Sequence, residues 1–89
     1  MNFGLMFNIF YARSVRKDLR DIPQDILKKI KLEIESLENF PNVKGTKKLT
    51  SHPFADFRLR IGNYRVLFDV NIQENEIYIL KIGHRKDIY

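Results

Sequence analysis

Three arginines lie close together in the stretch FRLRIGNYRV, residues 57–66. If its central Gly-Asn pair forms a two-residue turn, the flanking segments become the strands of a tight β-hairpin, because glycine accepts the positive φ that such a turn requires. Side chains alternate between the two faces of a strand, so Arg58, Arg60 and Arg65 are expected to share one face. Guanidinium groups bind phosphate oxygens in pairs and keep their charge, so this spacing predicts a phosphate-binding surface.

The expected hairpin pairing sets Arg60 directly opposite Arg65. Like charges in that arrangement destabilise a strand pair by roughly 0.2–1 kcal/mol, so we expect a negatively charged group to offset them. The competing interpretation is that the arginines are only solvated, or are paired with Asp56, Asp69 or Glu76. The opposite face is apolar and is expected to join the core: Phe57, Leu59, Ile61, Tyr64, Val66 and Phe68.

The net charge of +5 comes from 16 Lys and Arg residues against 11 Asp and Glu residues, and it is unevenly distributed. Between residues 44 and 65 there is a single acid, Asp56. The basic residues of this segment are Lys44, Lys47, Lys48, Arg58, Arg60 and Arg65. Such a concentration is typical of a surface that contacts nucleic-acid phosphates, and the alternative is a merely basic surface.

The composition also excludes several classes of protein. The chain has no cysteine, so a disulfide, a thiolate metal site and a cysteine nucleophile are excluded. No uninterrupted apolar run approaches the roughly 20 residues that span a bilayer, and the first residues lack the order of a signal peptide. We therefore expect a cytoplasmic protein with no membrane partner and a single domain over residues 1–89, in which residues 1–5 are a disordered extension if Met6 is the start.

A sheet and two helices are expected to hold this hairpin. Ser14 can cap a short helix with apolar residues at spacings of four and three, and Pro23 closes it and opens the next helix, which continues to about Asn39. Two helices joined this tightly are expected to fold back as an antiparallel pair. Residues 39–53 contain turn formers without a period and are predicted to be a loop. The expected strands are residues 7–11, 55–61, 64–70 and 76–82.

The resulting order of elements is β-α-α-β-β-β. It predicts an α+β fold, in which an antiparallel-rich twisted sheet has the antiparallel helix pair packed on one face. The uncovered face is expected to carry the arginines. The tail GHRKDIY, residues 83–89, follows the last strand and can bring an imidazole, a guanidinium and a phenol near that face, since Gly83 allows the chain to turn.

The hairpin and the tail together resemble the toxins of the RelE/ParE superfamily, and more particularly its RelE-like branch. The resemblance covers nearly the whole chain, from FNIFYARSVRKDL through KKLTSHPFADFRLRIGNYRVLFDV to IGHRKDIY. Its most specific part is the order of a strand x-R-L-R, a Gly-containing turn, Y-R-V, then G-H-R and a late I-Y. The chain departs from the best-known members by having arginine in place of lysine at positions 58 and 60, and it stops at Tyr89, where some relatives continue into a helix.

The resemblance implies the RelE-like fold and a ribosome-dependent endoribonuclease that cuts mRNA in the decoding site. The implied partners are the ribosome, mRNA and a cognate RelB-like antitoxin, and no metal or small-molecule cofactor is expected. The site residues that the resemblance implies are Arg58, Arg60, Arg65, Arg85 and Tyr89. The expected RNA contacts are Lys44, Lys47, Lys48 and His52. The alternative for this last segment is an ordinary mobile basic loop.

Metal-free RNA cleavage uses the adjacent 2′-OH as the nucleophile and leaves a 2′,3′-cyclic phosphate and a free 5′-OH. The hairpin arginines are expected to stabilise the charge around phosphorus, and Arg85 the phosphate or the leaving oxygen. Tyr89 is expected to stack on a base or to hold the geometry of the scissile bond. Arginine is a poor base because its pKa lies above about 12, so His84 is the expected base and His52 a second candidate. The alternatives are a surface or capping role for His84 and a frayed end at Tyr89.

Two other functions compete with the nuclease. Relatives in the ParE branch share the fold and inhibit DNA gyrase, and they generally lack the full basic set. A non-catalytic RNA-binding module would bind RNA in a salt-dependent way without cutting it. The complete set of four arginines and a late tyrosine favours the nuclease.

Overall fold

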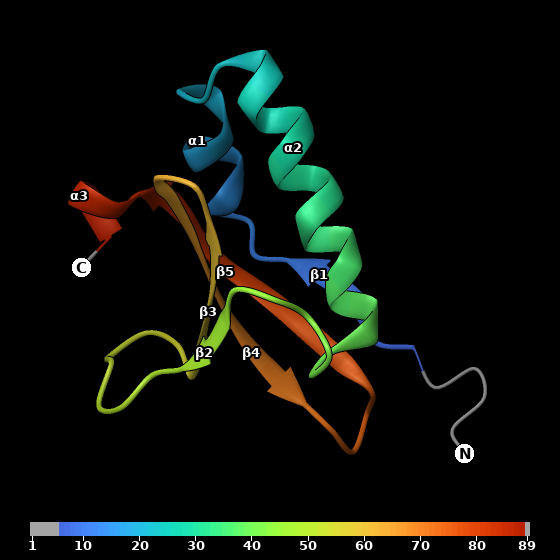
Figure 1. Ribbon diagram of the computed structural model, residues 1–89. Coiled ribbons are helices and arrows are strands. Elements are labelled where there is room, and N and C mark those ends of the chain that lie inside the picture. Colours follow the sequence, from blue (N-terminus) through green and yellow to red (C-terminus); the bar gives the residue numbers. More distant parts are fainter. Residues whose placement is uncertain (1–5, 89) are drawn as a thin grey trace.

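Residues 6–88, which the computed structural model describes, are built around one sheet of five strands: β1 (Asn8–Tyr11), β2 (Thr46–Lys48), β3 (Phe57–Ile61), β4 (Tyr64–Asn71) and β5 (Glu76–His84). Across the sheet the strands follow the order β1-β5-β4-β3-β2 (Figure 1). β1 runs parallel to β5, and the other neighbours are antiparallel. The extension expected at residues 1–5 lies outside the described residues, as does Tyr89.

Within the same residues, the sheet is accompanied by the helices α1 (Val15–Arg20), α2 (Gln24–Glu35), η1 (Ser36–Asn39) and α3 (Arg85–Ile88), of which η1 is a 3₁₀-helix. Ser14 stands at the N-cap of α1, although its side chain makes no capping hydrogen bond. Pro23 directly precedes α2, where its fixed φ and missing N–H are tolerated. The predicted α+β class and the order of its main elements are confirmed. No described helix is both long and apolar enough to cross a membrane.

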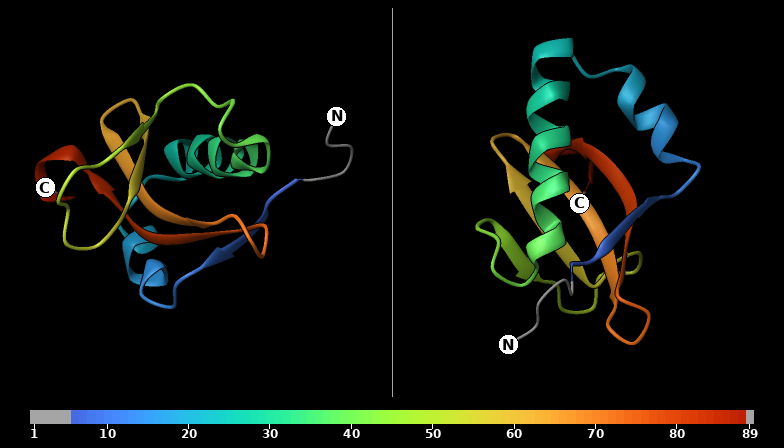
Figure 2. Two further views of the ribbon diagram at one scale, coloured as in Figure 1. Left: turned by 90° about the horizontal axis from the view of Figure 1, so that it is seen from below. Right: turned by 90° about the vertical axis from the view of Figure 1, so that its right-hand side faces the viewer.

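The helices α1 and α2 run antiparallel, as predicted, and they cover different parts of the sheet (Figure 2). α2 lies across the apolar face, whereas α1 lies against β5 beyond the end of β1. There the Asp18 carboxylate oxygen Oδ2 accepts a hydrogen bond from the backbone N–H of Ile82 at 3.0 Å. α1 thus satisfies a donor on the edge of β5 that the short strand β1 does not reach.

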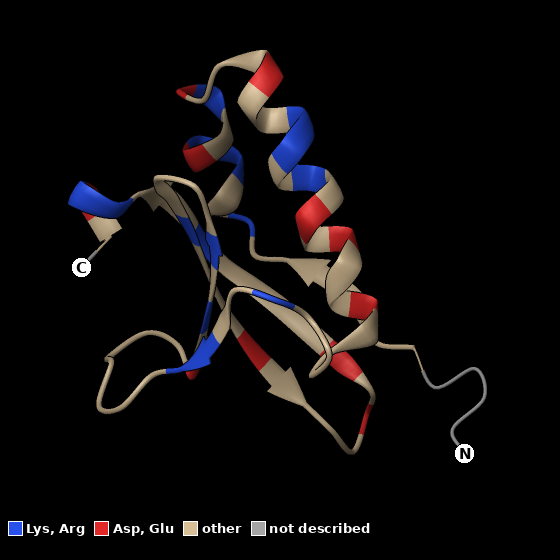
Figure 3. Ribbon diagram, viewed as in Figure 1, with Lys and Arg blue, Asp and Glu red and all other residues tan. Residues whose placement is uncertain are grey.

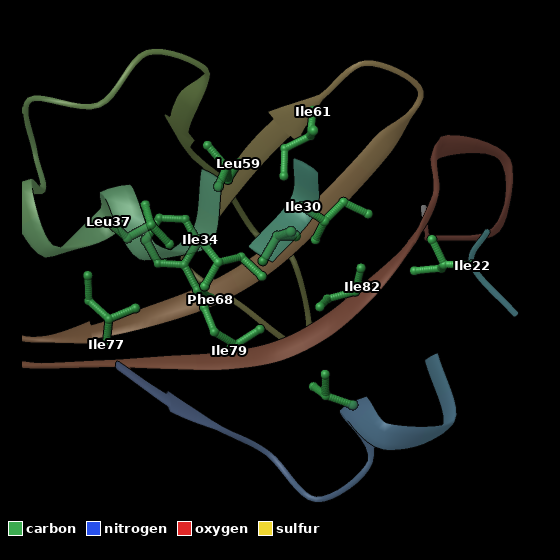
Figure 4. Packing of buried hydrophobic residues seen from close by; sticks show 12 residues of the cluster. Ile22, Ile30, Ile34, Leu37, Leu59, Ile61, Phe68, Ile77, Ile79 and Ile82 are labelled. Atoms are coloured by element: carbon green, nitrogen blue, oxygen red, sulfur yellow. The ribbon is translucent and has the colours of Figure 1, made fainter. Parts of the chain in front are cut away.

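The main core lies between the sheet and α2 (Figure 4). Its buried members are Val15, Ile22, Ile30, Ile34, Leu37, Leu59, Ile61, Val66, Phe68, Ile77, Ile79 and Ile82. Fully burying one aliphatic or aromatic side chain stabilises a protein by about 1.5–3 kcal/mol, so this packing holds one face of the hairpin firmly against α2. Phe57 and Tyr64 are partly buried against the same core, and the predicted apolar face of the hairpin is confirmed.

The hairpin of β3 and β4 has the predicted register. Ile61 pairs with Tyr64, and Arg60 pairs with Arg65. Gly62 has a φ of +57°, and no atom lies within 4 Å of the position that a Cβ would take there. The turn therefore requires glycine for its backbone conformation and not for lack of space.

The prediction that residues 39–53 form only a loop was wrong, because the segment contains β2. This strand pairs with β3, so that Lys47 lies opposite Arg58. Gly45, with a φ of +87°, leads into the strand, and its carbonyl accepts a hydrogen bond from the backbone N–H of Arg60 at 2.9 Å. Three residues are too few to show an alternating pattern, so β2 is formed by its pairing with β3 and not by local preference.

A bulge in β5 reverses the alternation of its side chains. Leu67 pairs with Lys81, but the next residue of β4, Phe68, pairs with Ile79. Leu80 is therefore an extra residue in β5, and no residue of β4 pairs with it. Counting alternate residues from the buried Ile79 would place Lys81 on the core face. Because of the bulge, Lys81 and the residues after it lie on the opposite face from the one given by that count.

Candidate nucleic-acid interface

Basic side chains form two rows across the sheet face that α2 leaves uncovered. In the first row the strand register aligns, from β2 to β5, Lys47, Arg58, Leu67 and Lys81. In the second row it aligns Arg60, Arg65 and Gly83. We call the cations of these two rows the basic face. Figure 3 shows the Lys and Arg positions of β2, β3 and β4 close together, while the acidic positions of β4, β5 and their connection lie toward the other end of the sheet.

Backbone carbonyls hold two of the arginines in place. Arg58 Nη1 donates a hydrogen bond to the carbonyl oxygen of Gly45 at 2.6 Å. Arg65 Nη1 donates to the carbonyl oxygens of Gly62 and Tyr64 at 2.9 and 3.0 Å. A guanidinium has five N–H donors, so both groups are oriented by the protein and still have donors left for a ligand.

Within residues 6–88, no carboxylate forms an ion pair with the three hairpin arginines. Two of the acids expected as alternatives have other partners. Asp69 Oδ1 accepts the backbone N–H of Asp56 at 2.8 Å. Glu76 Oε1 accepts the hydroxyl of Tyr78 at 2.6 Å, and this hydrogen bond raises the pKa of the Tyr78 phenol. The three hairpin arginines are therefore not paired with a carboxylate of residues 6–88, which leaves them available to an anionic ligand.

A second, smaller apolar cluster lies in the middle of the basic face. Leu67 is fully buried there, although its row neighbours are charged. It is covered by Ala55, from the connection between β2 and β3, and by Ile88 of α3, with Leu49 and Leu80 packed around them. We call these five residues the Leu67 cluster. The expectation of an uncovered face is thus corrected, because the connection and the tail close over its centre.

The tail folds back onto the hairpin turn. The backbone N–H of Arg85 donates a hydrogen bond to the carbonyl oxygen of Asn63 at 2.8 Å, which places the start of α3 beside the turn. Gly83, two residues before Arg85, pairs with Arg65 in the second row. The structure therefore brings Arg85 to the same end of the sheet as the Arg60 and Arg65 pair, while the predicted contribution of Tyr89 lies outside the described residues.

His84 lies on the opposite face from the arginines. Because of the bulge it pairs with Tyr64, and the two rings meet edge to face with their centroids 5.6 Å apart. His84 Nδ1 accepts the backbone N–H of Lys86 at 3.2 Å, so the neutral ring carries its proton on Nε2. The expectation from the sequence ended the strand at Ile82 and turned the chain at Gly83 toward the arginines, whereas β5 continues through His84.

Lys81 is a member of the basic face that sequence reasoning missed. Alternation counted from the buried Ile79 assigns this lysine to the core, and only the bulge at Leu80 turns it to the other face. A bulge depends on the partner strand, so no local signal could have found it. The buried side chain of Leu67 separates Lys81 from Arg58 within their row.

The predicted RNA contacts are divided by the structure. Lys47 belongs to the basic face, whereas Lys44 precedes β2 and Lys48 lies on the other side of that edge strand. His52 lies in the connection that closes over the Leu67 cluster, which is on the arginine side of the sheet. Its Nδ1 accepts the backbone N–H of Phe54 at 3.1 Å. Of the two expected bases, only His52 is therefore carried by a segment on the same side as the arginines.

A separate apolar groove of about 590 Å³ lies between α1 and α2, on the helix side of the sheet. Its apolar lining consists of Ala12, Val15, Leu19, Ile30 and Ile34. Exposed basic residues border it, namely Arg13, Arg16 and Lys31. Tyr11 lies at its end, where burial and the nearby charge of Glu35 raise the pKa of the phenol. We call this feature the helix groove; an apolar floor with a basic border suits an acidic amphipathic segment.

The chemistry that this arrangement supports most directly is phosphate binding. Oriented arginines can hold a phosphate and stabilise negative charge that develops on it. In the described part of the chain, no group of three or more His, Asp or Glu side chains is arranged to hold a metal ion. The proton transfers of a cleavage reaction would therefore fall to individual side chains near the basic face.

The sequence matches a family model described as the ParE toxin of the type II toxin-antitoxin system parDE, over residues 9–89. Toxin RelE3 of Methanocaldococcus jannaschii is 34% identical over 84 residues, which cover 91% of this chain and 93% of that protein. Toxin RelG of Mycobacterium tuberculosis is 29% identical over 84 residues, covering 93% of this chain and 95% of that toxin.

Solved structures give the same relationship. The RelB-RelE antitoxin-toxin complex from Methanococcus jannaschii contains a chain with 37% identity and a TM-score of 0.72, matched over 90% of this chain and 94% of that one. The archaeal RelE-RelB complex from Pyrococcus horikoshii gives 28% identity and a TM-score of 0.75 over 92% and 98%. The isolated Escherichia coli RelE toxin, at 15% identity and a TM-score of 0.68, shares the fold. The chain therefore belongs to the RelE/ParE superfamily of toxins from type II toxin-antitoxin systems.

Proposed function

We propose that this RelE-type toxin is a ribosome-dependent endoribonuclease that cuts mRNA in the decoding site and so inhibits translation in the cytoplasm. The observation that carries the proposal is the basic face, where the three hairpin arginines have no carboxylate partner within residues 6–88 and Arg85 lies beside the end of the sheet that carries Arg60 and Arg65. Arginines arranged in this way suit the phosphate of a single RNA strand. The similarity to toxins named RelE supports the same activity.

In the proposed reaction the 2′-oxygen of one nucleotide attacks the adjacent phosphorus, and the bond from phosphorus to the 5′-oxygen of the next nucleotide breaks. The 2′-OH proton leaves to a base, and one proton reaches the leaving oxygen. Arg58, Arg60 and Arg65 stabilise the added negative charge, for which one preorganised donor can be worth on the order of 3 kcal/mol. Arg85 is assigned to the phosphate or the leaving oxygen, and Tyr89 to stacking on a base or holding the geometry of the scissile bond.

The base in this proposal is His52 or His84. His52 is favoured by its place in the connection that covers the Leu67 cluster on the arginine side. His84 would have to leave its contact with Tyr64, or meet RNA that passes around the edge of the sheet. For either imidazole, accepting a proton at Nδ1 requires breaking the hydrogen bond from a backbone N–H.

Primer extension on mRNA held in programmed ribosomes tests the proposal. The wild-type protein is expected to cut within the decoding-site codon and to leave free mRNA intact. Arg85→Ala is expected to lose the cut, because it removes a cation beside the hairpin turn. Lys29→Ala serves as the matched control, since it removes one exposed positive charge from α2, away from the basic face.

A folded wild-type protein that leaves ribosome-bound mRNA uncut, with ribosomes from its own host, would contradict the nuclease proposal. Equal activity of Arg85→Ala and Lys29→Ala would contradict the assigned role of Arg85. Retained RNA binding without a cut would instead support a non-catalytic RNA-binding module.

We also propose a cognate RelB-like antitoxin as the partner of this chain. The relatives from Methanococcus jannaschii and Pyrococcus horikoshii were solved as complexes of RelE with RelB. The helix groove supplies a docking site for an acidic amphipathic segment of such an antitoxin, because its floor is apolar and its border basic. Neutralising the basic face requires a further acidic segment, since that face lies on the other side of the sheet.

The family model described as a ParE toxin favours a second candidate function, which is inhibition of DNA gyrase. A supercoiling assay with the same preparation separates the two functions. Loss of supercoiling by gyrase without mRNA cleavage would replace the nuclease proposal with this one.

A further inference from the structure

The Leu67 cluster joins the three segments that carry the proposed site residues. Leu67 belongs to the arginine hairpin, Ala55 to the connection that carries His52, and Ile88 to the tail that carries Arg85. Leu67 is 0% exposed, Ala55 5% and Ile88 6%, so the three side chains are closed off from solvent. This cluster is the place where hairpin, connection and tail meet.

The hairpin and the connection form a fixed seat for Ile88. The main core holds the opposite face of the hairpin, as described above. Two hydrogen bonds hold the C-terminal end of the connection, from the backbone N–H of Asp56 to Asp69 Oδ1 at 2.8 Å and from the backbone N–H of Leu49 to the carbonyl of Asp56 at 2.7 Å. Ala55 is therefore held next to Leu67 independently of the tail.

The tail, in contrast, depends on few contacts. α3 has only four residues, and a helix of that length has almost no stability of its own, because forming the first turn fixes several dihedral angles for one hydrogen bond. The bond from the Arg85 N–H to Asn63 holds its first residue. Ile88 holds its last residue and packs over the backbone of Gly83, where an added methyl group would lie 3.7 Å from Ile88 Cδ1.

We propose that Ile88 is a positioning residue of the nuclease site: its side chain, seated against Leu67 and Ala55, fixes α3 and thereby the approach of Arg85 to the hairpin arginines. The inference rests on the proposed nuclease function. Ile88 touches no reacting group and acts only through the backbone that carries Arg85. A displacement of a site group by about 1 Å can cost on the order of 10²-fold in rate, so the loss of this seat acts strongly on cleavage.

Three variants test the proposal together with the wild type. Ile88→Ala removes most of the side chain that packs against Leu67 and Ala55, and Ile88→Leu replaces it with a side chain of the same volume. Val70→Ala is the control, because Val70 lies on the same strand as Leu67 but packs against the main core, away from the tail. For each protein we would measure the cleavage rate on programmed ribosomes at saturating toxin, the half-saturating toxin concentration, the free energy of unfolding in urea and the hydrogen exchange of the Arg85 amide.

The expected result for Ile88→Ala is a fall in the saturated cleavage rate on the order of 10²-fold, with a much smaller change in the half-saturating concentration. Its Arg85 amide is expected to exchange faster, because the bond to Asn63 opens when α3 is no longer held. Ile88→Leu is expected to restore most of the rate and the protection. Val70→Ala is expected to lower the free energy of unfolding and leave the cleavage rate unchanged.

Wild-type cleavage by Ile88→Ala would overturn the inference, as would an equal loss of rate in Val70→Ala, which would mark a general effect of stability. The amide exchange keeps this test separate from that of the proposed function. If the wild type cuts no mRNA, the nuclease proposal is wrong. The hydrogen exchange still tests whether Ile88 holds α3, because unchanged exchange of the Arg85 amide in Ile88→Ala would contradict that contact.

Discussion

At the scale of single residues, Arg60 and Arg65 face each other across the hairpin but are held very differently. Arg65 donates to two carbonyls of the turn, so it stabilises the hairpin while it presents charge. Arg60 is exposed and has no side-chain partner among the described residues. In the free protein, Arg60 therefore adds repulsion without a compensating contact, as is common for residues retained for function.

Opposite effects on stability are accordingly expected from the two arginines. Arg60→Gln should raise the free energy of unfolding by roughly 0.2–1 kcal/mol, because it removes a like-charge pair. Arg65→Gln relieves the same repulsion but loses the turn hydrogen bonds, each worth about 0.5–1.5 kcal/mol, so it should lower stability. Urea unfolding measures both, and both variants should cut mRNA more slowly. A gain of stability in both would show that the turn contacts of Arg65 contribute little.

At the scale of elements, α1 is joined to the sheet by one polar contact among apolar ones. The carboxylate of Asp18 accepts the Ile82 N–H on the edge of β5, at the point where β1 has ended. An edge donor without a partner would be left open to water or to another chain. Asp18 therefore satisfies β5 at a point where a longer β1 would otherwise pair with it.

Asp18→Ala is expected to lower the free energy of unfolding by about 1–3 kcal/mol, since it leaves a partly buried N–H without its acceptor. Asp18→Asn keeps an acceptor oxygen at the same position and should recover much of the loss. Urea unfolding compares the two variants, and hydrogen exchange of the Ile82 amide reports the contact directly. Equal stability of the alanine variant and the wild type would mean that water replaces the carboxylate without loss.

The elements also show how far the sequence predicts this fold. The hairpin was predicted residue by residue, because its turn glycine and its alternating pattern are local signals. β2 and the bulge at Leu80 were not predicted, because both exist only through pairing with another strand. The Leu67 cluster left one readable signal, since Val66, Leu67 and Phe68 are consecutive apolar residues and such a run indicates a strand covered on both faces.

The candidate site was predictable to the same extent. The sequence identifies the three hairpin arginines and Arg85 as neighbours, and the structure places the three on one face of the sheet and Arg85 beside the end that carries Arg60 and Arg65. The expected position of His84 was wrong, because the sequence suggested a turn at Gly83, whereas β5 continues through His84 and the bulge at Leu80 sets the face on which it lies. The packing of residues 49–56 over the basic face could not be predicted either, because it depends on contacts between distant parts of the chain.

At the scale of the whole molecule, the two candidate binding surfaces lie on opposite sides of the sheet. The basic face is formed by β2 to β5, and the helix groove by α1 and α2 with the end of β1. The sheet separates the two surfaces, and they have no residue in common. Changes at one surface should therefore leave the other unaltered, because substitutions that are distant and share no partners act nearly independently.

The double variant Arg16→Glu, Lys31→Glu is expected to bind the proposed antitoxin at least about tenfold more weakly, since an acidic segment would meet like charge at the border of the helix groove. It should cut mRNA as the wild type does. Titration calorimetry with the antitoxin measures the affinity, and primer extension measures the cleavage. Lys29→Glu reverses a charge on α2 outside the groove and serves as the control. An equal loss of affinity in that control would argue against docking in the groove.

The bulge in β5 has a consequence for the gene as well as for the fold. Since no residue of β4 lies opposite Leu80, losing its codon would remove one member of the Leu67 cluster but leave Lys81 opposite Leu67 and His84 opposite Tyr64. We therefore expect a chain that lacks this one residue to keep its tail residues on the same side of the molecule. A one-residue gap at this point, in a comparison of related sequences, is expected to leave the orientation of the tail unchanged.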